Sequence, residues 1–274
     1  MASERQPLQN QRMTPPETKN TEPVIYEQPL NERMRMFLRL DFLYHQALHH
    51  EEQPDAWATR AAVSALLDIL AITARGDIRS EVLKELERQL IVMHDFQSRP
   101  GVDSARLRAV VSNLERLRTE LNSAGALFMQ RLRDSEFLNA IKHRSAIPGG
   151  TCEFDLPHYR HWLDQPFEVR SADYNEWMST IRPLCDAVTE LLWLTRETGR
   201  PRPEVAAGGT FQLAFDRDQP CQLLRIILPA GTDLYPEISG SHHRCSIRFM
   251  TLKDIHARPV QTLEDVKFFL TICG

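Results

Sequence analysis

Apolar residues in the first half of the chain recur every three or four positions, which is the spacing of helices that bury one face. Three of these stretches begin at a residue that can cap a helix, namely Asn31, Asp55 and Asp103. Four helices in succession indicate a bundle-like layer. The pattern predicts helices at 31–49, 55–76, 77–96 and 103–121.

The pattern is less regular in the middle of the chain. A helical segment ends near Arg144, and a Pro-Gly-Gly turn then leads into an extended run at 151–154, which predicts a strand. Two further helices are predicted at 158–163 and 173–198. Pro183 is expected to break or kink the second of them, because proline removes a helix hydrogen bond.

The character of the chain changes past Gly199. Residues 199–209 are rich in proline and glycine and are predicted to form a linker. Apolar and polar residues then alternate with a period of two, which is typical of half-buried antiparallel strands. Neither the early run 24–27 nor 151–154 has a sheet of its own, so both are expected to join the C-terminal strands. The predicted C-terminal strands are 211–215, 222–228, 244–250 and 266–272.

These elements predict an α+β protein in which a helical-bundle domain is joined to a smaller, mostly antiparallel β-sheet domain. The start of the chain is polar and rich in proline, and it is expected to be disordered. The expected order is a tail at 1–23, the first strand of the β domain at 24–29, the helical domain at 30–146, a turn and strand that join the β domain at 147–157, further helices of the helical domain at 158–199, and the C-terminal β domain at 200–274.

The charge balance argues against a partner held by bulk electrostatics. The chain has 274 residues, with 33 Lys and Arg against 37 Asp and Glu, which gives a formal net charge of −4. A protein that binds nucleic acid through its phosphates usually carries a clear basic excess. No nucleic-acid partner is therefore expected.

Cysteine use and hydropathy predict the compartment. The chain has five cysteines, an odd number, and none shows CxxC spacing, as is typical of a reduced, cytoplasmic chain. The longest apolar runs, such as 191–194, are far shorter than the roughly 18 residues that a membrane helix needs. We therefore expect a cytoplasmic protein with no direct membrane insertion.

The sequence contains no GxGxxG, GxxxxGK[ST], GxSxG or HExxH motif. Two histidine pairs leave an alternative open. His45 and His49 are spaced to chelate a metal, and His158 and His161 could border an active site, although a helix end and helix packing explain these pairs more simply. No catalytic residue, cofactor or metal is predicted, and a metal- or His-dependent hydrolase is kept as an alternative function.

Arginines recur in pairs on single faces of predicted elements. Strand alternation places Arg244 and Arg248 on one face, and Arg35 and Arg39 lie one turn apart on a helix, off its apolar stripe. Guanidinium groups bind carboxylates through two parallel hydrogen bonds. The pairs are therefore candidates for binding an acidic, partly apolar peptide. A plain solvent-exposed face and a nucleic-acid-binding module are the alternatives.

Several segments of the chain, in the same order, are similar to one family. The similarity extends over about residues 24 to 273, and it is to the ZapD family of bacterial cell-division proteins, which associate with the Z ring. The segments that carry it are YEQPLNE at 26–32, LKELERQ at 83–89, PGVD at 100–103, IPGG at 147–150, FDLP at 154–157, LYPEISG at 234–240 and IRFM at 247–250.

This resemblance implies a function. It implies a non-enzymatic, cytoplasmic homodimer at the mid-cell division site, which binds the C-terminal peptide of the tubulin-like protein FtsZ and cross-links FtsZ filaments into bundles. A dimer with one peptide groove per subunit is bivalent, as cross-linking requires. The arginines expected to bind the peptide in one shared groove are Arg35, Arg39, Arg244 and Arg248, with Arg144 and Arg160 as further candidates.

Overall fold

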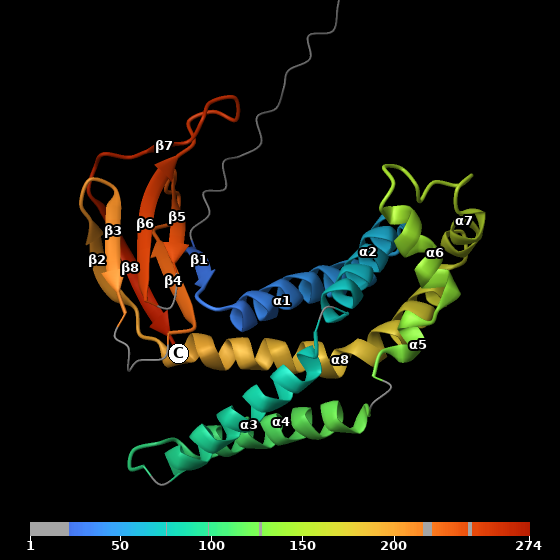
Figure 1. The fold of residues 1–274 in the computed structure, drawn as a ribbon, viewed down its shortest axis with the longest axis horizontal. Coiled ribbons are helices and arrows are strands. Elements are labelled where there is room, and N and C mark those ends of the chain that lie inside the picture. The colour runs from blue at the N-terminus through green and yellow to red at the C-terminus, as the bar shows by residue number, and fades with distance from the viewer. Residues whose placement is uncertain (1–21, 75, 98, 126–127, 216–220, 241–242) are drawn as a thin grey trace, which may run out of the picture.

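The structure is a computed structural model that describes residues 22–74, 76–97, 99–125, 128–215, 221–240 and 243–274. The predicted tail, 1–23, lies outside the described residues except for its last two positions. Within the described ranges the protein is α+β, as predicted: helices form one part, and antiparallel strands form a smaller part at one end (Figure 1).

The predicted helices of the first half are present, and each of the three predicted caps accepts hydrogen bonds from the first turn of its helix. Asn31 Oδ1 accepts the Met34 N–H at 2.8 Å, and Asp55 caps the next helix in the same way. The buried faces of the helices share one apolar core, which includes Phe37, Leu66 and Leu114. The helices are α1 (Glu32–Glu51), α2 (Ala56–Thr73), α3 (Ile78–Gln97), α4 (Ser104–Ser123), α5 (Gln130–Arg133), α6 (Glu136–Ser145), α7 (Pro157–Leu163) and α8 (Phe167–Thr198).

Helix α8 is longer than predicted. It begins at Phe167 and runs for 32 residues, and Pro183 lies inside it without breaking it. The ribbon of α8 changes direction along its length (Figure 1). Because α8 packs against α1, α3 and α4, tertiary packing outweighs the hydrogen bond that the proline removes.

Helix α2 is the one helix in the described ranges that is long and apolar enough to cross a bilayer by length and composition. More than half of it is buried inside the protein. Its apolar character is explained by this burial, because Leu66 and Ile69 lie fully within the helical core.

The strands form two antiparallel sheets. One has the order β1-β4-β8-β2, and the other has the order β3-β6-β5 with β7 paired to β6. β1 pairs with β4, so the first strand joins the C-terminal strands as predicted. Residues from both sheets, including Ile226, Ile247, Phe249 and Phe268, share a second apolar core. The strands are β1 (Val24–Pro29), β2 (Arg202–Ala206), β3 (Thr210–Ala214), β4 (Leu223–Leu228), β5 (Leu234–Gly240), β6 (Arg244–Thr251), β7 (Val260–Gln261) and β8 (Val266–Cys273).

The prediction of a linker at 199–209 was wrong, because residues 202–206 in the middle of this segment form β2. β2 lies at the edge of its sheet and pairs only with β8, so Pro203 is tolerated where no second neighbour needs an N–H donor. Gly199 shows how closely this segment packs. A Cβ at this position would lie 2.4 Å from Thr271 Cγ2 of β8, so the end of α8 touches the sheet.

The strand predicted at 151–154 was also wrong. The segment forms consecutive turns, in which the Gly150 N–H donates to the Ile147 carbonyl at 2.9 Å and the Cys152 N–H donates to the Gly149 carbonyl at 3.0 Å. It lies between α6 and α7, at the end of the molecule away from the sheets (Figure 1). The backbone groups of this segment are used in local turn hydrogen bonds, so they are not available to pair with a neighbouring strand.

An ion-pair network fixes the sheet to the helices. Arg196 of α8 donates to both carboxylate oxygens of Glu27 on β1, at 2.9 and 2.8 Å, and Arg225 of β4 donates to the same carboxylate at 3.0 Å. The Asp41 carboxylate of α1 accepts a hydrogen bond from the hydroxyl of Thr189, which lies on α8, at 2.8 Å. These contacts set the position of α1 relative to β1.

Candidate functional site

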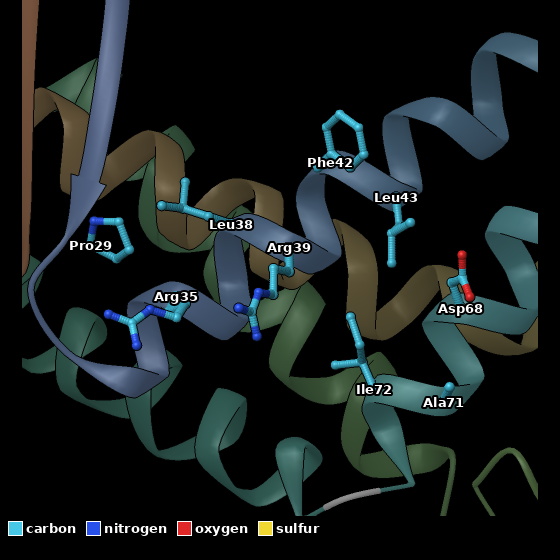
Figure 2. A pocket seen from close by; sticks show the side chains of 9 residues that line it. All are labelled: Pro29, Arg35, Leu38, Arg39, Phe42, Leu43, Asp68, Ala71 and Ile72. Carbon is cyan, nitrogen blue, oxygen red and sulfur yellow. The ribbon is translucent and has the colours of Figure 1, made fainter. Parts of the chain in front are cut away.

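A groove of about 490 Å³ lies between α1 and α2, at the end where β1 leads into α1 (Figure 2). Most of its lining is apolar, and the charged groups come from both helices. The lining residues are Pro29, Arg35, Leu38, Arg39, Phe42, Leu43, Asp68, Ala71 and Ile72.

The sequence of α1 dictates which side chains reach this groove. Met34, Phe37 and Leu40 are buried in the helical core, so they fix the inward face of the helix. Arg35 and Arg39 fall between these positions and therefore project to the outer side. The helix presents a second, mixed face of arginines and apolar residues to the groove.

The apolar part of the groove is open to solvent. The Phe42 side chain is 70% exposed, and Leu38 and Leu43 beside it are only partly buried. Ile72 approaches from α2 (Figure 2). An exposed phenyl ring above a partly buried aliphatic floor is suited to receive an apolar side chain from a partner.

The charged groups of the groove differ in how they are partnered. Arg35 forms an ion pair with Glu32, one turn earlier on α1, and both side chains are exposed. Arg39 and Asp68 form no ion pair or side-chain hydrogen bond with any described residue. Burial raises the pKa of the Asp68 carboxyl above its ordinary value. The groove thus offers an unpaired cation and an unpaired anion.

The second predicted arginine pair lies on β6. Its alternation follows the prediction: Cys245, Ile247 and Phe249 are buried, whereas Arg244 and Arg248 are exposed. Arg248 pairs with Glu237 of β5 at 2.9 Å. Arg244 lines a separate, more polar groove of about 540 Å³ with Gln212, Leu213, Ala214, Ser239, Cys245 and Ser246.

The two grooves share no lining residue. They are nevertheless neighbours in the fold, because a Cβ on Gly240, at the end of β5, would lie 3.1 Å from Leu30 Cδ2, and Leu30 connects β1 to α1. Gly240 pairs with Cys245, next to Arg244. That the two arginine pairs act on one ligand stays a prediction.

Arg144 and Arg160 lie at the other end of the helical part, where both are paired with carboxylates. Arg144 contacts Asp155 at 3.3 Å, and Arg160 contacts Glu153 and Asp164, each at 2.8 Å. These ion pairs tie the turns between α6 and α7 to their flanking helices. The structure does not bring these two arginines into the groove between α1 and α2.

The two histidine pairs have structural contacts. His45 Nδ1 lies 2.8 Å from the Asp41 carbonyl, and His49 contacts Gln53. His158 packs edge-on against the Phe137 ring. Among the described residues, no group of three or more His, Cys, Asp or Glu side chains could hold a metal ion.

Of the residues that line the groove, only Arg35 and Arg39 were predicted from the sequence. Leu38 and Phe42 gave a usable signal, since they are apolar, one turn apart and off the core stripe of α1. Asp68 and Ile72 gave none, because their contribution depends on how α2 packs against α1. That packing is a tertiary property, and the period of a single helix does not encode it.

Taken together, these features define an α+β protein with an open groove that combines an apolar floor with charged walls. Comparison with known proteins gives its family. The model of the family described as "ZapD: Cell division protein" matches residues 38–248. The chain belongs to the ZapD family of cell division proteins, and the family is named for a role in cell division, with no enzymatic activity indicated.

Curated relatives match over nearly their whole length. The cell division protein ZapD of Methylococcus capsulatus is 38% identical over 250 residues, which is 91% of this chain and 98% of the relative. The protein of the same name from Chromobacterium violaceum is 35% identical, over 91% of this chain and 99% of the relative. That of Coxiella burnetii is 34% identical, over 91% and 97%.

Proposed function

We propose that the protein is a cytoplasmic homodimer that binds the C-terminal peptide of FtsZ and cross-links FtsZ filaments at the division site. The observation that carries this proposal is the groove between α1 and α2, where Arg35 and Arg39 stand beside exposed Phe42. Paired arginines fit carboxylates, and the apolar floor fits the apolar residues of a short peptide.

The arginines of β6 extend the same proposal. Arg244 lies at the start of β6, close to the connection between β1 and α1, so a peptide that leaves the first groove past Pro29 would approach it. Arg248 would exchange its contact with Glu237 for a carboxylate of the ligand. Arg144 and Arg160 contribute least, because they lie at the other end of the helical part and line neither groove.

Dimerisation is supported by an apolar row on the outer face of the first sheet. Ile25, Ile227, Phe269 and Pro203 lie in register across its four strands, and Phe269 is 49% exposed. We propose that this row pairs with the same row of a second copy, because a two-fold interface must be self-complementary.

Co-sedimentation with FtsZ filaments tests the groove. The substitutions Arg39→Glu and Arg248→Glu are each expected to reduce the protein that pellets with filaments by at least about tenfold, through loss of a cation and repulsion of the peptide. Arg108→Glu, which makes the same change at an exposed position of α4, is the matched control. FtsZ without its C-terminal peptide should fail to retain the unchanged protein.

Two outcomes would contradict the groove assignment. One is undiminished pelleting of folded Arg39→Glu and Arg248→Glu proteins. The other is equal retention by full-length and shortened FtsZ, which would place the binding site on another part of FtsZ.

Sedimentation velocity tests the dimer. Phe269→Glu should convert a dimer into a monomer that still binds the FtsZ peptide but no longer bundles filaments. Phe42→Glu should remain a dimer but lose binding to the FtsZ peptide, since it alters the groove and leaves the outer face of the sheet intact. A Phe269→Glu protein that remains dimeric would show that the interface lies elsewhere.

A further inference from the structure

The groove between α1 and α2 carries opposite charges at its two ends. Arg35 lies beside Pro29, where α1 begins, and Arg39 follows one turn later (Figure 2). Asp68 projects from α2 at the other end, beside Leu43 (Figure 2). Apolar side chains occupy the space between the charges, so the two ends of the groove carry opposite charge.

No polar contact with a described residue ties Asp68 to the rest of the fold. Asp68 makes no hydrogen bond or ion pair with any described residue, and Arg39 across the groove is also unpaired. Because an exposed carboxylate in an apolar groove loses solvation when a ligand covers it, it favours a ligand that brings a positive charge. A ligand with an acidic side chain at this end would be repelled.

We propose that Asp68 determines the specificity and direction of peptide binding. The groove accepts a segment with an acidic residue at Arg35 and Arg39, apolar residues over Leu43 and Ile72, and a basic residue at Asp68. This inference rests on the proposed function, because it assumes that the groove is the peptide site. It adds that the peptide must carry both charges and can lie in only one direction.

The helix geometry gives the spacing of the two charges. Arg35 and Leu43 are eight positions apart, which corresponds to about 12 Å along α1. An extended peptide advances about 3.3 Å per residue, so its acidic and basic residues should be separated by about four positions. A peptide with adjacent charges cannot reach both ends of the groove.

The first experiment measures binding of full-length FtsZ to the full chain by fluorescence anisotropy. Asp68→Asn is expected to weaken binding about threefold, and Asp68→Lys about tenfold, because the lysine repels the basic residue of the peptide. Ser64→Lys is the matched control, since it places the same charge one turn earlier on α2 at an exposed position outside the groove. Equal affinities for Asp68→Lys and Ser64→Lys would overturn the inference.

The second experiment uses two synthetic probe peptides of identical composition. One has an acidic residue, three apolar residues and a basic residue in that order, and the other has the reverse order. One order should bind at least about fivefold tighter, and Asp68→Asn should abolish the difference. Equal binding of both orders, or a preference that survives Asp68→Asn, would overturn the inference.

The two proposals fail differently. If Arg39→Glu removes FtsZ binding but the Asp68 variants do not change it, the groove is the peptide site and the role of Asp68 is wrong. If Arg39→Glu also leaves FtsZ binding unchanged, the proposed function of the groove fails, and the inference about Asp68 fails with it.

Discussion

Glu27 is a single acidic side chain that joins three elements. Its carboxylate is 19% exposed and accepts hydrogen bonds from Arg196 of α8 and Arg225 of β4. Both arginines are themselves mostly covered, so loss of the carboxylate would leave two cations close together with little solvent. The position of the sheet relative to α8 depends on this residue.

Glu27→Gln should therefore lower the free energy of unfolding by about 2 kcal/mol, a value reduced from that of fully buried pairs because solvent reaches part of the network. Urea unfolding followed by circular dichroism measures it. Glu153→Gln is the control, since its ion pair with Arg160 is solvent-exposed and should contribute less than about 1 kcal/mol. Equal losses in the two variants would contradict the role given to Glu27.

At the scale of the elements, the cap of α1 connects stability to binding. Asn31 accepts the Met34 N–H and so fixes the first turn, which carries Arg35. Asn31→Ala should lower the free energy of unfolding by about 1 kcal/mol and should also weaken FtsZ binding, because the turn that carries Arg35 frays. Urea unfolding and fluorescence anisotropy measure the two effects.

Asp55→Ala removes the equivalent cap of α2, which lies more than three turns from Asp68 and the groove. Asp55→Ala should lower the free energy of unfolding by a similar amount but should not change FtsZ binding. If the two cap variants weakened FtsZ binding equally, general destabilisation would explain the loss and the cap of α1 would have no specific role.

Elements with a strong period could be predicted from the sequence, and elements defined by their neighbours could not. The helix at 31–49 was found because its core stripe is regular, and the strand at 244–250 was found because its alternation is regular. β2 and β5 were missed because Pro203 and Pro236 argue against a strand unless it lies at a sheet edge. Edge position is a property of the assembled sheet.

The site followed the same rule. Each arginine pair could be placed on one face from spacing alone, since that face depends only on the local element. That Arg35 and Arg39 share their groove with Asp68, and that Arg244 lines a different one, depends on contacts between elements. Local periodicity carries no information about such contacts.

At the scale of the whole molecule, each apolar core buries side chains that stay protonated at a pH where they would ionise in water. Burial raises the pKa of the Cys245 and Cys273 thiols from 9.0 to about 11 and that of the Tyr159 hydroxyl from 10.0 to about 12. The folded chain keeps these protons at a pH where the unfolded chain releases them. The stability that the two cysteines contribute is therefore complete below pH 9 and is lost as the pH rises toward 11, and that of Tyr159 is lost between pH 10 and pH 12.

The free energy of unfolding should consequently fall between pH 9 and pH 10, by about 1 kcal/mol for each of the two cysteines. Urea midpoints measured at pH 8, 9 and 10 under reducing conditions provide the test. Cys245→Ala should start from a lower stability but show a shallower decrease with pH. A midpoint that does not change between pH 8 and pH 10 would contradict the assignment.

The direct connection of β1 to α1 has a mechanical consequence. Only Leu30 and Asn31 separate the edge strand from the helix that lines the groove, so a force applied to a ligand in the groove passes into β1. A strand at a sheet edge, pulled from its end, separates from its neighbour one hydrogen bond at a time. Glu27 lies two residues from that end, and its contacts with Arg196 and Arg225 oppose the first steps of separation. In the cross-link proposed above, the load that the protein can bear is set at this junction.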